Sequence, residues 1–144
     1  MKTTENNIGF VLRKISTLQF AIIEEVHKKK GEETLTTSVK FGINRELRNL
    51  SVVVTIQFEK QNTPFLITEA ACEFNVAKTA WEKFKVSNSE LIEVPKGFIT
   101  HLTVLTIGTV RGILHAKTEG TTFNGYVLPT LNVSELITEN IRFE

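Results

Sequence analysis

Hydrophobic and polar residues alternate along the first half of the chain, a pattern typical of β-strands. The alternation is clearest in residues 35–43, 50–58 and 65–76, and it is weaker in residues 20–26. A period of two places successive side chains on opposite faces, so that one face of each strand is apolar. The pattern therefore predicts four half-buried strands of an antiparallel sheet.

Polar segments rich in turn-forming residues separate these predicted strands. Residues 28–33 have the composition of a hairpin tip, and residues 45–49 that of a short turn. Residues 61–64 have turn chemistry, with Pro64 at a strand start, where proline is tolerated. Three short connections are therefore expected between consecutive strands.

The apolar positions of the fourth predicted strand change phase. Phe65 and Ile67 occupy odd positions, whereas Cys72, Phe74 and Val76 occupy even positions. One extra residue in a strand shifts its side-chain alternation by one. We therefore expect a β-bulge near residues 69–71.

Residues 97–118 combine features of a strand and of a helix. Many of them are β-branched, which favours a strand. However, Gly108, Gly112 and Ala116 recur every four residues, and 22 residues are long for one strand. We therefore predict one long helix, preceded by an irregular segment in which Trp81 and Phe84 form a helical turn or an anchored loop.

The end of the sequence predicts a loop and a short helix. Glycine and proline mark residues 120–130 as a loop. Asn132 and Glu135 have the spacing of a capping box at a helix start, and apolar residues follow up to Ile141. Strands followed by helices indicate an α+β fold: a four-stranded antiparallel sheet followed by a long helix and a short C-terminal helix packed on one face.

Length and composition narrow the class of protein. A chain of 144 residues with 41% apolar residues is expected to form a single domain, residues 1–144, with residues 1–7 flexible. A net charge of +1 predicts no general attraction to nucleic acid or to an anionic membrane. Threonine, glycine or charged residues interrupt the apolar stretches, so we expect no membrane span. The single cysteine, Cys72, and the absence of an apolar leader favour the cytoplasm.

The sequence offers little for catalysis or metal binding. All sixteen acidic residues are glutamate, which excludes triads and metal loops built on aspartate. His101 and His115 are about 21 Å apart along a helix, too far to share an ion. We therefore predict no catalytic residue, no metal and no cofactor. The alternative, a small-molecule hydrolase, would depend on Glu69 or Glu73 facing a closed pocket.

Four short motifs resemble the SecB export chaperones and their relatives, in the family's order and spacing. The resemblance runs from Ile8 to Ile141. Val110-Arg111-Gly112 resembles the end of the family's long helix, and Leu128-Pro129-x-Leu131-Asn132-Val133 the approach to its last helix. Val39-Lys40-Phe41 and Phe65-Leu66 resemble the second and fourth strands.

This resemblance implies a function and a set of sites. The family binds unfolded polypeptide in exposed apolar grooves without nucleotide, and it assembles as a dimer of dimers. The residues expected to bind such a client are apolar residues of the second strand and the last helix: Val39, Phe41, Ile43, Val133, Leu136, Ile137 and Ile141. The residues expected at a contact between subunits are Gly108, Arg111, Gly112 and Ala116. The alternative for the client residues is that they belong to the hydrophobic core. The alternative for the small residues is that they only leave space for the helix to pack over the sheet.

The sequence departs from export members of the family in its charge and its last residues. Export members are strongly acidic and carry a basic tail that docks on the Sec translocase motor, whereas this chain is near neutral and stops at Arg142-Phe143-Glu144. An acidic position of their first strand corresponds to Gln19, although Glu69 matches one on the fourth. The resemblance therefore implies client binding more directly than delivery to the motor. A dedicated partner of one protein, such as an antitoxin, is the alternative.

Overall fold

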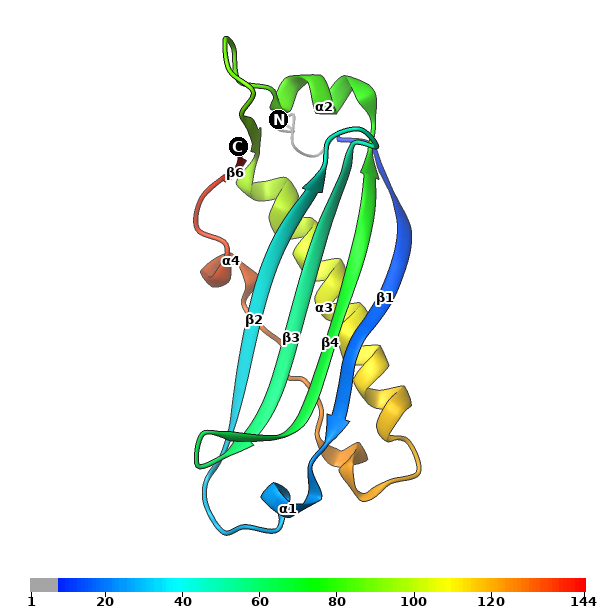
Figure 1. Ribbon diagram of the computed structural model, residues 1–144, viewed down its shortest axis with the longest axis vertical. Helices are drawn as coiled ribbons and strands as arrows, with labels where there is room; N and C mark the ends of the chain where they lie inside the picture. The colour runs from blue at the N-terminus through cyan, green and yellow to red at the C-terminus, as the bar shows by residue number, and fades with distance from the viewer. Residues whose placement is uncertain (1–7) are drawn as a thin grey trace.

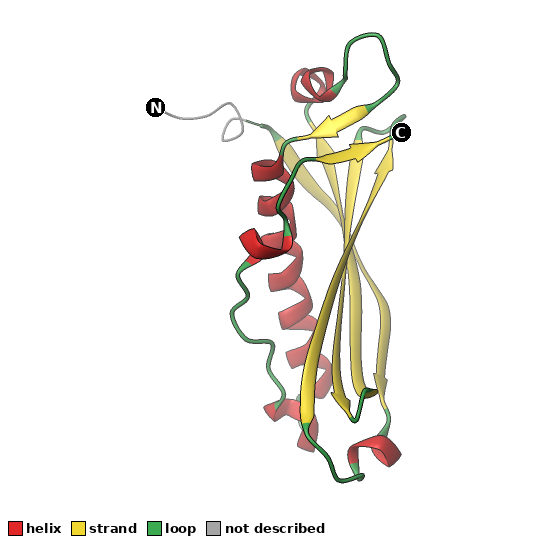
Figure 2. Cartoon of the chain, turned by 90° about the vertical axis from the view of Figure 1, so that its left-hand side faces the viewer, coloured by secondary structure: helices red, strands yellow, loops and turns green. Residues whose placement is uncertain are grey.

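The computed structural model describes residues 8–144, so the flexibility expected for residues 1–7 lies outside the described residues. A four-stranded antiparallel sheet dominates the structure, in the order β1-β4-β3-β2. One face of this sheet carries the long helix α3, and none of the helices within residues 8–144 covers the other face (Figures 1 and 2). The strands are β1 (Phe10–Ile22), β2 (Glu33–Asn44), β3 (Asn49–Lys60) and β4 (Thr63–Val76).

The remaining elements lie around α3 and at the two ends of the sheet. The helices are α1 (Glu24–His27), α2 (Lys78–Phe84), α3 (Lys96–Thr118), the 3-10 helix η2 (Thr122–Gly125) and α4 (Val133–Leu136). Two short strands, β5 (Ile92–Val94) and β6 (Ile141–Phe143), form a separate antiparallel sheet. The predicted α+β class, with its four-stranded sheet, long helix and short C-terminal helix, is confirmed.

Strands β2, β3 and β4 form a meander through two tight turns, as predicted. Gln61 and Asn62 join β3 to β4 with φ angles of 50° and 64°. Two positive φ angles in a two-residue loop suit the right-handed twist of a hairpin. The hairpin tip predicted at residues 28–33 is wrong, because β1 pairs with β4 rather than with β2. This segment instead crosses the end of the sheet (Figure 1).

Strand β1 begins ten residues earlier than the strand predicted at residues 20–26. Two register shifts against β4 explain the difference, because each inserts one extra residue, Arg13 and Leu18. The side chains of β1 on the α3 side therefore follow spacings of 2, 3, 2, 3 and 2 rather than a strict period of two. They pair with even-numbered β4 residues throughout, and they are Phe10, Leu12, Ile15, Thr17, Phe20 and Ile22.

The bulge predicted near residues 69–71 of β4 is also wrong in position. The pairing of β4 with β3 runs without interruption from Leu66 to Asn75. The register shifts instead at Phe65, which has no partner between the pairs Phe58↔Leu66 and Glu59↔Pro64. Phe65 is therefore turned into the core although its number is odd.

Helix α3 packs its buried face on β3 and β4. Thr103, Thr106 and Thr118 are fully buried there, and each hydroxyl donates to the carbonyl four residues earlier at 2.7–2.9 Å. These bonds satisfy the hydroxyls without any partner from the sheet, which explains how a threonine-rich segment forms a core helix. Helix α3 is long and apolar enough to cross a membrane by length and composition alone, a property that buried core helices share, and 44% of its most apolar 18-residue segment is buried inside the protein.

After α3 the chain returns along the whole helix (Figure 1). We call residues 126–143 the C-terminal strap. The helix predicted from Asn132 to Ile141 is only the single turn α4, and Ile141 belongs to strand β6. The predicted capping box does not form, because the Asn132 side chain makes no cap bond and instead accepts from the Ser134 hydroxyl.

Candidate functional site

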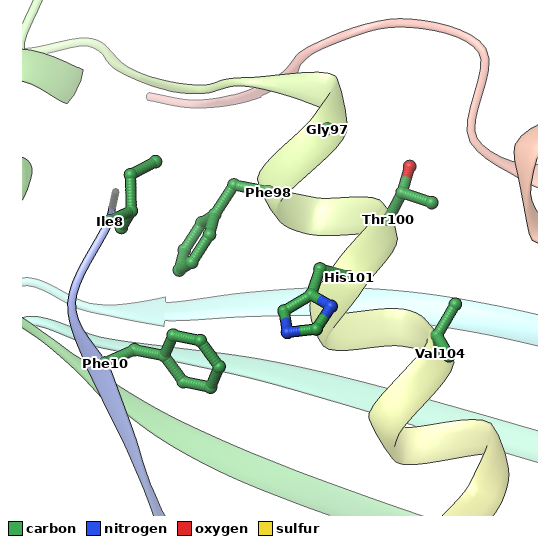
Figure 3. Close-up of a pocket in the computed structure, with 7 residues that line it drawn as sticks. All are labelled: Ile8, Phe10, Gly97, Phe98, Thr100, His101 and Val104. Atoms are coloured by element: carbon green, nitrogen blue, oxygen red, sulfur yellow. The ribbon is translucent and has the colours of Figure 1, made fainter. Parts of the chain in front are cut away.

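An apolar cavity opens between the start of β1 and the first turns of α3. Its volume is about 470 Å³. Figure 3 shows Phe98 and His101 pointing from α3 toward Phe10 and Ile8 on the β1 side. The lining residues are Ile8, Phe10, Gly97, Phe98, Thr100, His101 and Val104.

The cavity continues as a strip of exposed apolar side chains. Leu12 and Ile15 follow Phe10 on the same side of β1, and they are 42% and 50% exposed. Val104 on α3 is 48% exposed. We call this surface the β1–α3 groove: Ile8, Phe10, Leu12, Ile15, Phe98, His101 and Val104. Because exposed apolar patches on a soluble protein mark interaction sites, the groove is the first candidate site.

Strand β1 gives the groove a second binding feature. It lies at the edge of the sheet, so the backbone N–H and C=O groups on its outer side have no partner strand among residues 8–144. An extended chain can pair with such an edge while alternate side chains enter a neighbouring pocket. The β1–α3 groove therefore offers backbone pairing and apolar contacts side by side.

The rings of the groove form a packed aromatic floor. The Phe10 ring lies edge-on to Phe98 and to His101, with centroids 5.6 Å apart in both pairs, and it also contacts Phe74 at 5.8 Å. Phe74 and Phe98 are buried, whereas His101 is exposed. The core therefore holds these rings in place, and a ligand can reach them from the exposed side of the cluster, where His101 lies.

The residues predicted to bind a client lie on the opposite side of α3, under and within the strap. Val39, Phe41 and Ile43 point from β2 toward this layer and are half-buried against the core. On the strap, Val133 and Ile137 are buried, Ile141 is half-buried, and Leu136 is 45% exposed. The structure thus brings the predicted residues other than Leu136 into one apolar cluster, to which the strap contributes Val133, Ile137 and Ile141.

The small residues predicted at a subunit contact lie on the open side of α3. An added Cβ at Gly108 or Gly112 would meet no atom within 4 Å. Ala116, one turn further on, is exposed as well. Clearance over the sheet is therefore not the reason for these two glycines, and this side of α3 stays open to a close neighbour.

Arg111, predicted at the same contact, binds the strap of its own chain. Its Nε donates to the carbonyl of Leu128 and its guanidinium NH2 group to that of Pro129, each at 3.0 Å. One planar guanidinium thereby holds two consecutive carbonyls of the strap. No sequence pattern indicates this role, because the acceptors are backbone carbonyls 17 and 18 residues away.

The strap begins at an aromatic cluster beyond the end of α3. The Tyr126 hydroxyl donates to Glu33 at 2.8 Å and lies 3.0 Å from Nε2 of His27. Lys60 completes the network, 3.4 Å from the Glu33 carboxylate and 2.6 Å from the carbonyl of His27. Burial and the bond to Glu33 raise the pKa of Tyr126 to about 12, because both disfavour the phenolate.

The strap ends against the start of α3. The Asn140 side chain accepts from the backbone N–H of Lys96 at 2.8 Å and donates to Glu93 at 2.8 Å. Arg45, in the β2–β3 turn, donates to the carbonyl of Phe143 at 3.1 Å. Side chains far apart in the sequence thus fix both ends of the strap.

The residues considered for chemistry do not converge on a pocket. Glu69 and Glu73 lie on the sheet face that no helix covers, and Glu69 accepts from the Thr55 hydroxyl at 2.5 Å. Cys72 is buried in the core. Within residues 8–144, no cluster of three or more histidine, cysteine or acidic side chains is arranged to hold a metal ion. Glu69, Glu73 and Cys72 therefore do not form a common site in the described part of the chain.

The β1–α3 groove itself was missed from the sequence. Its β1 residues did not show a period of two, because of the bulges at Arg13 and Leu18. A signal was present in Phe10, Leu12 and Ile15, since each is apolar and all three fall on one side once a bulge is allowed.

Comparison with known proteins finds similarity only among solved structures. No protein-family model matches the chain. No curated protein matches its sequence. One structural match is a SecB-like chaperone of Mycobacterium tuberculosis in complex with a peptide from an antitoxin, with 11% identity, a TM-score of 0.48, and coverage of 85% of this chain and 91% of that chain. Another is a protein of unknown function from Streptococcus agalactiae, with 12% identity, a TM-score of 0.36, and coverage of 87% and 98%.

Proposed function

We propose that this protein is an ATP-independent holding chaperone that binds unfolded or non-native polypeptide in exposed apolar grooves. The observation that carries this proposal is the β1–α3 groove, an open apolar cavity beside a strand edge that no other strand of the described chain pairs with. Backbone pairing on β1 is independent of client sequence, and a pocket lined by Phe10, Phe98 and Val104 accepts many apolar side chains. Both properties suit a protein that must accept varied unfolded segments.

The expected strength of binding supports a holding role. Each apolar side chain that a client covers contributes roughly 1.5–3 kcal/mol at most. A few such contacts, after the cost of ordering the client, give reversible binding without a single dominant anchor. No nucleotide is needed for a cycle of this kind.

We further propose that the protein works as a homo-oligomer, a dimer of dimers, in the cytoplasm. The open glycines of α3, Gly108 and Gly112, allow a second helix to approach closely. The single free thiol, Cys72, suits a reducing compartment. Clients in this proposal include preproteins for Sec-dependent export, and the alternative is one dedicated partner such as an antitoxin.

Binding of a permanently unfolded protein tests the proposal. Reduced, carboxymethylated α-lactalbumin should bind without nucleotide, and the protein should suppress aggregation of a reduced, unfolding client at a near-stoichiometric ratio. Ile15→Ser or Val104→Ser should weaken binding about tenfold, which corresponds to about 1.4 kcal/mol. The matched control is Leu47→Ser in the β2–β3 turn, where Leu47 is 58% exposed but lies outside the groove.

Two results would contradict the proposal. One is a folded wild-type protein that neither binds the unfolded polypeptide nor slows aggregation. The other is a Leu47→Ser variant that loses as much affinity as Ile15→Ser, because binding would then not depend on the groove. Co-purification of one tight partner, in place of a spectrum of unfolded proteins, would favour the dedicated role.

A further inference from the structure

The last strand of the chain is held by a small number of contacts. β6 pairs with β5 through three residue pairs, Ile92↔Phe143, Glu93↔Arg142 and Val94↔Ile141. It has no place in the four-stranded sheet. Isolated two-stranded pairs are marginal in water, so β6 is held less firmly than any strand of the main sheet.

Most of the polar bonds that hold β6 use backbone groups. The β5–β6 ladder is backbone to backbone, and Arg45 binds the carbonyl of Phe143 rather than its side chain. Any extended polypeptide carries the same donors and acceptors at the same spacing. The groups that hold β6 are therefore equally suited to a foreign segment.

The surface beneath β6 is strongly apolar. Ile92 is 3% exposed and Val94 is fully buried while β6 is in place. Ile141 and Phe143 are the side chains of β6 that pack on this core. Departure of β6 would uncover apolar area, which favours a replacement with apolar side chains at the same alternate positions.

Glu93, the middle residue of β5, adds a preference for a positively charged residue on the strand that pairs with it. The Glu93 carboxylate is 2.9 Å from Nε of Arg142 and also accepts from Asn140. A segment that replaces β6 would place its central residue opposite Glu93. An apolar-basic-apolar triplet, as in Ile141-Arg142-Phe143, is thus the complementary sequence.

We propose that β5 is a docking strand for extended client segments of this apolar-basic-apolar kind, and that β6 occupies it in the free protein as a built-in competitor. The proposal rests on the polypeptide-binding function proposed above and adds a second, gated site. The Arg111 bonds to Leu128 and Pro129 keep the first part of the strap in place, so the opening is confined to residues that follow Pro129.

A reversible disulfide between β5 and β6 tests this gating. Glu93 and Arg142 face each other across the two strands, a separation that a disulfide can span. The variant is Glu93→Cys with Arg142→Cys in a Cys72→Ala background, and the probe is a carboxymethylated unfolded polypeptide containing Ile-Arg-Phe triplets. Binding is compared between the oxidised and reduced forms of this variant, because both lack the Glu93 carboxylate. Oxidation should weaken binding at least tenfold, and reduction of the same sample should restore it.

A second cysteine pair controls for the chemistry of the disulfide. Thr36→Cys with Gln57→Cys joins β2 to β3 on the sheet face that no helix covers, where no client site is proposed. Oxidation of this pair should leave affinity within twofold. Equal binding by the oxidised and reduced forms of the β5–β6 pair would overturn the gating proposal while leaving the chaperone function intact.

Hydrogen exchange on the wild-type protein provides an independent readout. Saturating probe should expose the amides of residues 141–143 while those of residues 92–94 stay protected, because the client replaces β6 on β5. Unchanged protection of both strands, or loss of protection in both, would overturn the proposal. If neither wild type nor the reduced pair binds the probe, the chaperone function and the gating fail together.

Discussion

The side chain of Asn140 caps a helix that begins 44 residues earlier in the chain. Its amide oxygen accepts from the backbone N–H of Lys96 at the start of α3, and the residue before the helix, Pro95, makes no side-chain cap. The first N–H groups of a helix have no partner within it. The C-terminal strap therefore supplies a bond that the local sequence does not.

Removal of this cap should destabilise the fold. Asn140→Ala should lower the free energy of unfolding by about 1 kcal/mol, the usual cost of losing an N-cap. Urea unfolding followed by fluorescence of Trp81, the only tryptophan and a buried one, measures the change. Asn132→Ala is the control, since its side chain bonds only to Ser134, and it should stay within about 0.5 kcal/mol. Equal losses in the two variants would show that Asn140 does not act as a cap.

The two hydrogen bonds from the Arg111 guanidinium should hold the C-terminal strap at Leu128 and Pro129. Arg111→Ala leaves the carbonyls of Leu128 and Pro129 without their charged donor, so we expect a loss of about 1–3 kcal/mol. Hydrogen exchange should quicken over residues 126–137 and remain unchanged in β3 and β4. Arg111→Lys should recover only part of the loss, because an ammonium lacks the planar fork. The exposed Arg13 on β1 provides a neutral control as Arg13→Ala, and exchange that quickens throughout the sheet of Arg111→Ala would refute a local role.

Substitution of an open glycine of α3 should stabilise the isolated protomer but weaken the association of protomers. Gly108→Ala places its Cβ in empty space, so the isolated protomer should gain about 1 kcal/mol from helix propensity. If two copies meet on this face, the same methyl group should weaken their association, measured by sedimentation equilibrium. As a control, Gly120→Ala should cost about 1 kcal/mol without affecting association, because Gly120 has φ +81°. Unchanged association in Gly108→Ala would place the subunit contact elsewhere.

Tyr126 should make the fold sensitive to alkaline pH. Burial and the bond to Glu33 raise its pKa to about 12, above the ordinary value of 10.0 expected in the unfolded chain. Between these values the folded state binds more protons, so this contribution to stability is fully present below pH 10.0 and is lost as pH rises through about 12. Tyr126 is the only tyrosine, so near-ultraviolet absorbance of the phenolate reports it alone.

Two variants separate the causes of this shift. Glu33→Gln removes the charged acceptor, so the phenolate should form at lower pH than in wild type but still above 10.0, because burial remains the larger cause. Tyr126→Phe should flatten the loss of stability over the same pH range. A wild-type titration midpoint near 10.0 would mean that the hydroxyl is not held in this network.

The strands of the meander and the long helix were predictable because their patterns are regular. β2 and β3 alternate strictly, and β2, β3 and β4 extend only a few residues beyond the predicted segments. α3 covers residues 96–118 against a predicted 97–118, since spacing and length outweighed its β-branched residues. β1 was misplaced because Arg13 and Leu18 interrupt its period, and the positions of these two bulges are defined by pairing with β4.

The ends of the strap depend on contacts that no local pattern encodes. Ile137 and Ile141 fit one face of a short helix, yet Ile141 lies in a strand whose three residues need β5 as a partner. Short apolar runs do not distinguish the two structures. The predicted client residues other than Leu136 do share one apolar cluster, but the strap that packs on it could be found only from the tertiary structure.

The contacts at the ends of the C-terminal strap also influence the order in which parts of the protein fold. His27 meets Tyr126 across 99 positions, and Arg45 meets Phe143 across 98. Closing such long loops costs chain entropy before any contact at their ends is gained. The sheet and α3 should therefore assemble first during folding. The strap should then dock as a separate, slower step and be the first part to detach when the protein unfolds.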